Sequence, residues 1–433
     1  MLAIVIFMVC FIGLACLRIP VPFSVGTAAM ISMIIGGMNI SSVPGAIFGA
    51  LDSFPYLAIP AFIYSGDLMT LGGISRALMS WVRAILGRVK GAVGATVVIA
   101  SALFGTISGS SVATVSAIGS MMLPEMLRAG YDRKYAAALI AASGFIGILI
   151  PPSIPGIIYA MTAAQPVGEV WLSTACAGIM VCLVYIIYNR IFFGNQEKMP
   201  EEPFTIKSYV QDVGSKSPRA LVAILMPLII FVGVYGGILT PTEAGAVAVF
   251  YGFLAGWVIY PLLFKDKSGQ GLIALTKKSA VTSAGICLLI AFAGVATKMF
   301  TFAGAGQALS QFMLGVTDSP AVFLLIVNCV LILVGMFMET NTSILLLGPI
   351  LIPTAQAFGI DPIHFGAIML LNLEIGMITP PFACNLFVAC RISGLTMDKL
   401  LKPILGFVAC CIPVLLITTY IPASVMWLVN LIR

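Results

Sequence analysis

The chain has 433 residues, of which 60% are hydrophobic and 9% charged, and its formal net charge is +6. Soluble domains carry roughly 25% charged residues, so this composition excludes a soluble globular domain. Apolar runs of roughly 18–25 residues can cross ~30 Å of hydrocarbon as helices, whereas a β-barrel would show short alternating segments. The sequence therefore predicts an all-α polytopic membrane protein with about ten crossings.

The charged and metal-binding residue types narrow the function further. Basic residues cluster in short loops between apolar runs, which is typical of cytoplasmic loops and explains the net charge without a nucleic-acid partner. The ten cysteines lie in or beside apolar segments without a Cys-x-x-Cys motif, and His364 is the single histidine. Metal centres and disulfides are therefore not expected, and His364 is interpreted as a packing residue.

Residues 1–69 contain apolar runs at 2–17, 21–40 and 54–69, which we expect to form scaffold helices. The first run has no basic region before it and no small-residue cleavage site, so it is expected to be retained. Arg18 follows this run, which predicts an N-terminus outside the membrane and Arg18 inside. Residues 70–90 carry four bases on an amphipathic pattern, which favours an arm helix along the cytoplasmic surface.

Residues 91–127 are apolar or small, yet Lys90 precedes them and Arg128 follows them. The segment therefore enters and leaves the membrane on one side. Two full crossings would need roughly 40 residues plus a turn. Because GTISGSSVAT lies at its centre, the segment predicts a re-entrant helical hairpin with an unwound tip.

Residues 135–161 contain GFIGILIPPSIPG, in which Pro151 and Pro152 are expected to break the helix. Broken backbone is tolerated in a membrane only against protein or a water-filled cavity. A run at 171–188 completes a first repeat, 1–188, and a polar cytoplasmic linker is predicted at 189–218.

The second half, 219–433, repeats this plan. Scaffold helices are predicted at 219–300, an arm at 301–319, a hairpin at 321–357 and a broken helix at 362–390 that contains GMITPP. A final run at 403–421 crosses outward. The second hairpin carries METNTS and has no flanking bases, so it is expected to enter from the outside.

The two halves align without a gap at a shift of 229 positions (348 minus 119). Loop charges place matching segments on opposite membrane faces, which predicts two inverted-topology repeats, the architecture of secondary transporters. The aligned pairs are Gly119 with Gly348, Pro124 with Pro353, Gly130 with Gly359, Asp132 with Asp361, Gly147 with Gly376, Pro151 with Pro380 and Pro152 with Pro381.

Hairpin tips and helix breaks leave backbone carbonyls unpaired, and these are ligands for a hard cation such as Na⁺. We therefore predict one sodium site per repeat, with Pro151 and Pro380 breaking the helices and two or more ions bound. The first site is predicted to use Ser108, Gly109, Ser110, Ser111, Gly147, Ile150 and Pro152. The second is predicted to use Gly335, Glu339, Thr340, Asn341, Thr342, Gly376, Thr379 and Pro381.

Candidate substrate contacts are Thr114, Ser153, Lys298 and Asn385. Lys298 lies near the end of an apolar run, where it either extends to the outer interface or faces a cavity and meets a substrate carboxylate. Glu339 could tune the second cation site or pair with Lys298. Asp67 lies in the inverted counterpart of the Lys298 region, and Glu243 at a helix start favours capping.

Four motifs together resemble the large membrane subunit of tripartite ATP-independent periplasmic (TRAP) transporters, within the ion-transporter superfamily. They are TPTEAGA at 240–246, GSSVAT with the following LPEM, GILIPPS at 147–153 and GMITPP at 376–381, and the resemblance covers essentially the whole chain.

This resemblance implies a sodium-driven importer with an elevator mechanism in the bacterial inner membrane. The loop charges predict that both termini are periplasmic. It implies a small four-helix membrane subunit and a periplasmic substrate-binding protein as partners. The cargo would be an organic acid anion, with sialic acid and C4-dicarboxylates leading.

A stand-alone sodium/anion symporter of the same superfamily is the alternative function. A channel would not need two matched hairpins facing opposite ways. An enzyme would be expected to concentrate Asp, Glu, His or Cys in one place, which this sequence does not do.

Overall fold

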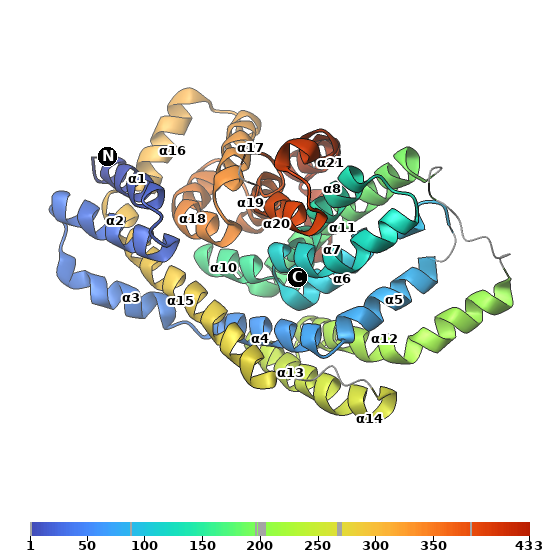
Figure 1. The fold of residues 1–433 in the computed structure, drawn as a ribbon. Helices are drawn as coiled ribbons and strands as arrows, with labels where there is room; N and C mark the ends of the chain where they lie inside the picture. Colours follow the sequence, from blue (N-terminus) through green and yellow to red (C-terminus); the bar gives the residue numbers. More distant parts are fainter. Residues whose placement is uncertain (1, 87–88, 195–196, 198–204, 266–270, 382) are drawn as a thin grey trace.

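The computed structural model describes residues 2–86, 89–194, 197, 205–265, 271–381 and 383–433, and the regular elements in these ranges are helices (Figure 1). The all-α fold class is therefore confirmed. The first half contains α1 Leu2–Cys16, α2 Val21–Ile35, α3 Val43–Leu51, α4 Ala58–Leu71, α5 Ile74–Leu86, α6 Ala92–Ser108, α7 Ser111–Arg128, α8 Arg133–Ser143, α9 Ile146–Leu149, α10 Ile154–Thr162 and α11 Val167–Phe192.

The second half contains longer scaffold helices and an additional C-terminal helix. Its elements are α12 Ile206–Tyr235, α13 Pro241–Phe253, α14 Tyr260–Phe264, α15 Leu272–Phe302, α16 Ala305–Val316, α17 Pro320–Phe337, α18 Thr340–Ala357, α19 Pro362–Gly376, α20 Cys384–Ser393, α21 Met397–Tyr420 and α22 Ala423–Ile432. A π-helical segment, Leu254–Ile259, joins α13 to α14.

Six helices in the described ranges are long and apolar enough to cross a membrane, or up to eight if each of two bent helix pairs is one span. The protein is therefore a multi-pass membrane protein, whereas about ten crossings stays a prediction. Apolar side chains on the outer helices support membrane burial, since Phe48 is 69% exposed and Leu262 is 75% exposed within this chain.

Three segments differ from the sequence-based expectation. Helix α3 occupies part of the expected connection between 40 and 54, and the pair Ile40–Leu51 and Phe54–Thr70 is bent by 62°. Helix α12 begins at Ile206, inside the predicted linker 189–218, because its polar first turns pack against α5. Helix α22 follows the last predicted run. Residues 87–88 of the predicted arm, and 195–196 and 198–204 of the linker, lie outside the described residues.

The helices form two groups that lie side by side (Figure 1). In the group that we call the scaffold, α15 packs against α2, α3 and α4, while α13 packs against α4 and α12. In the group that we call the core, α11 packs against α6, α19, α21 and α22, and α7 packs against α8 and α20. The core contains α19, which is buried along nearly its whole length, from Ile363 to Gly376.

Two short helices connect these groups. Helix α5 packs against α12 of the scaffold and α6 of the core, and α16 packs against α15 and α18 in the same way. Both cover the ranges in which arms were expected from the amphipathic pattern. Each therefore contacts a scaffold helix and one of the two helices of a helical hairpin.

The broken helices of the two halves start with the same turn. Asp132 caps α8 by accepting from the backbone N–H groups of Lys134 and Tyr135, and Asp361 caps α19 in the same way. Gly130 and Gly359 precede these caps with φ of +92° and +76°, a backbone conformation that favours glycine. These paired residues are 229 positions apart (361 minus 132).

Candidate functional site

The first hairpin tip is neutral and rich in hydroxyls. Helix α6 ends at Ser108, Gly109 turns the chain with φ of +60°, and Ser110 caps α7 by accepting from the Ala113 N–H at 3.4 Å. The Thr114 hydroxyl donates to the Ser110 carbonyl at 2.8 Å and lies 3.1 Å from the Ser108 hydroxyl. The tip thus places hydroxyl and carbonyl oxygens where two helix ends meet.

A broken helix lies directly behind this tip. The segments Arg133–Leu149 and Ile154–Thr162 are bent by 47°, and the Pro151–Pro152 peptide between them is cis. Gly147 of α9 touches α6, because a Cβ added to Gly105 would lie 1.9 Å from the Gly147 Cα. Two glycines therefore let the broken helix approach the hairpin just below its tip.

The second hairpin tip carries an acid. Helix α17 ends at Phe337, and Glu339 caps α18 by accepting from the N–H groups of Asn341 at 3.0 Å and Thr342 at 3.4 Å. The Asn341 side-chain amide also donates to Glu339 at 2.7 Å. A carboxylate at this position complements the positive end of the helix dipole.

Glu374 of α19 stands behind this second tip. Its side chain is 0% exposed, and its Oε1 accepts from the Thr340 hydroxyl at 2.7 Å. Glu339 and Glu374 lie close enough to interact electrostatically. Within the described part of the chain, no Lys, Arg or His forms an ion pair with either carboxylate.

The second break repeats the geometry of the first. Helix α19 ends at Gly376, and the Pro380–Pro381 peptide is cis. A Cβ added to Gly376 would lie 2.5 Å from the Gly335 backbone of α17. Thr379 donates its hydroxyl to the Ile375 carbonyl at 2.6 Å.

Several buried acceptors near the second tip have no hydrogen-bond partner among the described residues. They are Oε2 of Glu374 and Oδ1 of Asn341, and both side-chain amide atoms of Asn385 at the start of α20 are also unpaired. Because buried polar atoms are normally hydrogen-bonded, such a cluster requires a further group. Oxygen ligands with a negative charge suit a hard cation.

One cavity of about 740 Å³ joins the two tips. Its core side includes Ser108, Ser110, Glu339 and Asn341, while its scaffold side comes from α4 and α15. The lining thus combines both tips with a wall formed by the other helix group. A small organic molecule would fit in this space.

The scaffold wall contributes an ion pair to the cavity. Lys278 of α15 pairs with Asp67 of α4 at 2.9 Å, and the Ser279 hydroxyl donates to the other Asp67 oxygen at 2.7 Å. The Lys278 side chain is 70% exposed, so its ammonium group is accessible from the cavity. It is the single cationic residue in the lining that the structure describes.

The predicted sodium residues and the predicted substrate residues are placed differently. Residues 108–111 of the first tip and Glu339, Asn341 and Thr342 of the second line one cavity, whereas Thr340 does not. Gly147 and Gly376 touch the hairpins behind the tips. Thr114, Ser153, Lys298 and Asn385 do not line that cavity, and their contact with substrate stays a prediction. Ser153 instead caps α10 by accepting from the Gly156 N–H at 3.1 Å.

The structure does not contain the Glu339–Lys298 pair that was one open alternative. Lys298 donates to the Ser42 carbonyl at 3.3 Å and lines a separate cavity. Glu243 forms the expected cap, in which the Thr240 side chain and N–H exchange hydrogen bonds with Glu243. His364 is buried, with its Nε2 2.7 Å from the Thr418 carbonyl.

Two charged residues of the site were missed from the sequence. Glu374 is a lone acid inside an apolar run, two positions before Gly376, and a buried charge in a membrane segment is a general signal of function. That signal could have found it. Lys278 follows Lys277 at the start of an apolar run, and this pattern does not separate a cavity residue from an ordinary flanking base.

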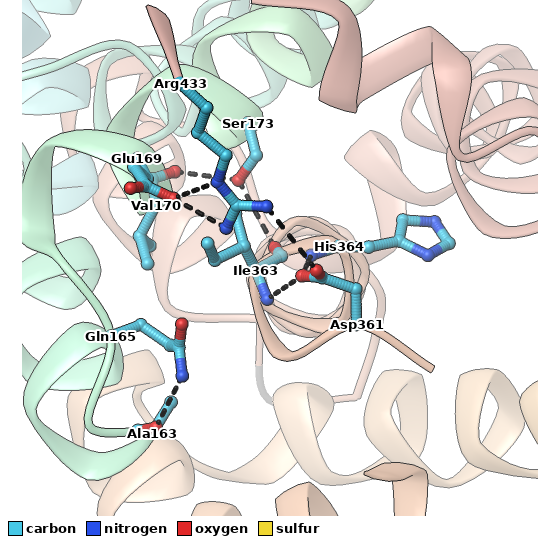
Figure 2. Close-up of polar contacts among 9 residues, drawn as sticks. All are labelled: Ala163, Gln165, Glu169, Val170, Ser173, Asp361, Ile363, His364 and Arg433. Atoms are coloured by element: carbon cyan, nitrogen blue, oxygen red, sulfur yellow. Dashed lines mark hydrogen bonds and ion pairs between the residues drawn. The ribbon is translucent and has the colours of Figure 1, made fainter. Parts of the chain in front are cut away.

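A second polar cluster lies away from the tips and holds core helices together (Figure 2). Arg433 donates from Nε to Glu169 at 2.8 Å, and its Nη1 lies 4.0 Å from Asp361. Ser173 of α11 donates its hydroxyl to the Ile363 carbonyl at 3.3 Å. These contacts connect the segment after α22 with α11 and with the N-terminal cap of α19.

Comparisons with known proteins agree with this architecture. Residues 8–424 match the family described as "Tripartite ATP-independent periplasmic transporter, DctM component". The isethionate TRAP transporter permease protein DctMQ of Oleidesulfovibrio alaskensis is 35% identical over 94% of this chain. The chain spans 64% of that relative's length.

Two further relatives match along nearly their whole length. The C4-dicarboxylate TRAP transporter large permease protein DctM of Pseudomonas aeruginosa is 33% identical and covers 93% of each chain. The sialic acid TRAP transporter large permease protein SiaM of Vibrio cholerae is 31% identical over 97% of each chain. These relatives are named as permeases for three different organic acids.

A solved structure shares the fold. The crystal structure of the Alcanivorax borkumensis YdaH transporter, whose title reports an unusual topology, superposes with a TM-score of 0.64. The match covers 90% of this chain and 88% of that one at 16% identity. This likeness supports the fold alone, and the two tips and their cavity carry the functional argument.

Proposed function

This chain belongs to the DctM component family of TRAP transporters, and from that premise we propose that it is the large membrane subunit of a sodium-coupled importer of a small organic acid. The observation that carries the proposal is the convergence of two hairpin tips from different halves of the chain on one cavity. Each tip lies beside a helix that breaks at a Pro-Pro pair.

In this proposal each tip holds a sodium ion with its neighbouring break. At the first tip the ligands are Ser and backbone oxygens, and Gly147 lets the broken backbone approach. At the second tip Asn341 and Glu374 supply oxygens that lack other partners. Sodium neutralises part of the carboxylate charge there, which lowers the cost of holding acids inside a membrane.

The acid substrate would bind in the cavity between the tips. Bound cations and the N-terminal ends of α7 and α18 favour an anion there. Both helices begin at the tips and point these ends toward the cavity, since Ser110, Asn341 and Thr342 line it. Lys278 adds a positive charge from the scaffold side.

Transport would proceed by movement of the core against the scaffold. The core carries both tips, while α5 and α16 are the arms that connect it to scaffold helices. Moving the whole core keeps the ions and the acid inside protein, which avoids exposing charge to lipid at a cost of several kcal/mol. The two halves would then be inverted-topology repeats in the bacterial inner membrane, with both termini periplasmic.

The partners follow from the family. We propose a small four-helix membrane subunit and a periplasmic binding protein that delivers the acid. Isethionate, C4-dicarboxylates and sialic acid are the candidate cargoes, because relatives carry these names.

Reconstitution in proteoliposomes tests the proposal. The chain would be inserted with and without candidate small-subunit and binding-protein partners, and uptake of labelled isethionate, succinate and sialic acid would be measured under an imposed sodium gradient. We expect sodium-dependent uptake of one of the acids with all partners present. Uptake that ignores sodium would refute the coupling, and full uptake by this chain alone would favour the stand-alone symporter.

A further inference from the structure

We propose that a second cavity, lined by the C-terminal part of the scaffold helix α15, is a separate binding site for the transported anion (the docking station). Lys298 supplies its counter-charge. This inference rests on the proposed function and adds a place where the acid binds before or after it meets the tips. The ligand that this cavity would recognise is a carboxylate or a similar small anion.

The second cavity lies between the two helix groups. Its volume is about 390 Å³, and its walls come from α3 and α15 of the scaffold and from α10 and α18 of the core. Gly45 and Gly49 of α3 line it, and a Cβ added to either would meet no atom within 4 Å. The glycines therefore leave room that ordinary side chains would fill.

Lys298 is the cationic residue of this cavity, and one hydrogen bond to a described residue is recorded for its half-buried ammonium group. It donates to the Ser42 carbonyl at 3.3 Å, and it lies 5.8 Å from the centre of the Phe302 ring. An ammonium group has three donors, and no carboxylate among the described residues pairs with this one. A half-buried cation beside an open space is complementary to an anion of cavity size.

Helix α15 places its two cavity lysines one membrane thickness apart. Lys278 lines the tips' cavity and Lys298 lines the second cavity, 20 residues later (298 minus 278). At ~1.5 Å per residue this separation is about 30 Å along the helix. The scaffold therefore offers one cation to each cavity, toward opposite ends of α15.

The path of the core relates the two cavities. Helix α18 begins at the second tip with Thr340, and its Leu345 and Pro349 line the second cavity. Pro349 lies nine residues along the helix (349 minus 340), which is about 13 Å. A shift of the core by that distance along α18 would bring the second tip beside Lys298.

The anionic group that would occupy the second cavity could come from two sources. A free organic acid and the phosphate of a lipid headgroup both carry the negative charge that Lys298 would attract. Because both helix groups form the walls, a bound acid would be released when the core moves. We therefore assign the site to the free acid and use lipid composition to test the other source.

The test uses Lys298→Gln and Lys298→Arg in the reconstituted full complex. Uptake of labelled isethionate, succinate and sialic acid is measured against external concentration, in vesicles of neutral phosphatidylcholine and in vesicles with added anionic phosphatidylglycerol. We expect Lys298→Gln to raise the half-saturating acid concentration about tenfold, because it removes a charge-assisted contact. Lys298→Arg should retain most of the affinity, and sodium half-saturation should not change.

Three further variants control the test. Lys277→Gln removes an exposed charge from the same helix that lines neither cavity, and should leave the acid concentration dependence unchanged. Gly49→Leu fills the second cavity and Gly285→Leu fills the tips' cavity, where a Cβ also meets no atom within 4 Å. Both glycine variants should slow uptake. Gly49→Leu should also raise the half-saturating acid concentration, as Lys298→Gln does.

Several outcomes would overturn the proposal. An unchanged half-saturating acid concentration in Lys298→Gln would overturn it. An effect that appears only in vesicles with phosphatidylglycerol would also overturn it, because that result would indicate a lipid-binding site. If wild-type uptake ignores sodium, the proposed function fails by itself. Equilibrium binding of the three labelled acids to wild type and Lys298→Gln then decides the docking station separately, because a station without Lys298 should bind about tenfold more weakly.

Discussion

Residues 108–111 end the first hairpin with hydroxyls alone, whereas residues 339–342 end the second with a carboxylate that is backed by Glu374. Both tips otherwise use the same parts. A glycine pair brings each broken helix against its hairpin, and each break contains a cis Pro-Pro peptide. The backbone plan is thus shared between the halves, and the charge is confined to one of them.

The two tips share a backbone shape but differ in charge. Position 110 holds serine where position 339 holds glutamate, and Phe145 stands where the second half has Glu374 (374 minus 229). A neutral tip can attract a cation only through dipoles, while a carboxylate adds a full charge that is strong in a buried setting. We therefore expect the two proposed sodium sites to differ in affinity and in their response to mutation.

The largest effect on stability is expected at the glycine contacts that both halves share. Gly105→Ala and Gly376→Ala each place a Cβ within 2.5 Å of backbone on the facing helix. Backbone cannot move aside, so each variant should lose about 3 kcal/mol or more of stability. Gly285→Ala, in open space within a helix, should be neutral or stabilising by up to ~1 kcal/mol.

Thermal unfolding of the purified variants, together with the yield of folded protein, measures this effect. Equal melting temperatures for Gly105→Ala and Gly285→Ala would contradict the glycine contact. A loss at Gly105 without one at Gly376 would show that the two halves do not share this packing.

The next effect tests the charged tip. Glu374→Gln keeps the shape of the side chain but removes its charge, so the apparent sodium affinity should fall roughly 10- to 100-fold, as for loss of a charge-assisted contact. Sodium-dependent uptake across a sodium titration measures it. Glu125→Gln, at a half-buried acid that lines no part of the tips' cavity and pairs with Arg83, is the matched control and should leave the titration unchanged. If both variants behave like wild type, Glu374 does not serve the cation.

A smaller effect is expected at the neutral tip. Ser108→Ala removes one uncharged oxygen, and about 1 kcal/mol corresponds to a roughly fivefold loss of sodium affinity. Ser120→Ala is the control, because Ser120 also lines the cavity but donates to the Ala117 carbonyl within its own helix. A loss as large as that of Glu374→Gln would contradict the proposed difference between the tips.

The smallest effect concerns the arms. Arg83 of α5 pairs with Glu125 of α7, whereas α16 meets α18 through a neutral contact between Ser310 and Thr354 at 3.2 Å. Arg83→Ala should cost at most ~1 kcal/mol, since the pair is partly exposed, and the cost should fall as salt is added. Ser310→Ala should show no salt dependence. Unfolding measured at low and high salt separates the two, and equal salt dependence would contradict the assignment.

The sequence predicted the regular parts of the molecule better than its charged site. The hairpin at 91–127 was expected from its length and flanking charges, the break at 135–161 from its prolines, and the arms from their amphipathic pattern, all of which are local signals. Helix α3 was missed because its small residues resemble a loop, and α22 because it is short and starts after Pro422.

The site contacts depend on tertiary packing, which periodicity does not encode. Thr340 reaches Glu374 across 34 positions, and Lys278 reaches Asp67 across 211. Lys298 was recognised as a candidate, but its separation from Glu339 depends on which side of α15 faces each cavity. The repeat located the tips, and the structure was needed to show which charges surround them.

Equilibrium binding of radioactive sodium to the purified chain in lipid nanodiscs tests the central claim most directly, with Ser108→Ala and Glu374→Gln measured beside wild type. We predict two classes of site in wild type, of which Ser108→Ala weakens one and Glu374→Gln weakens the other. Absence of saturable sodium binding in wild type, or one class of sites that neither substitution changes, would contradict it.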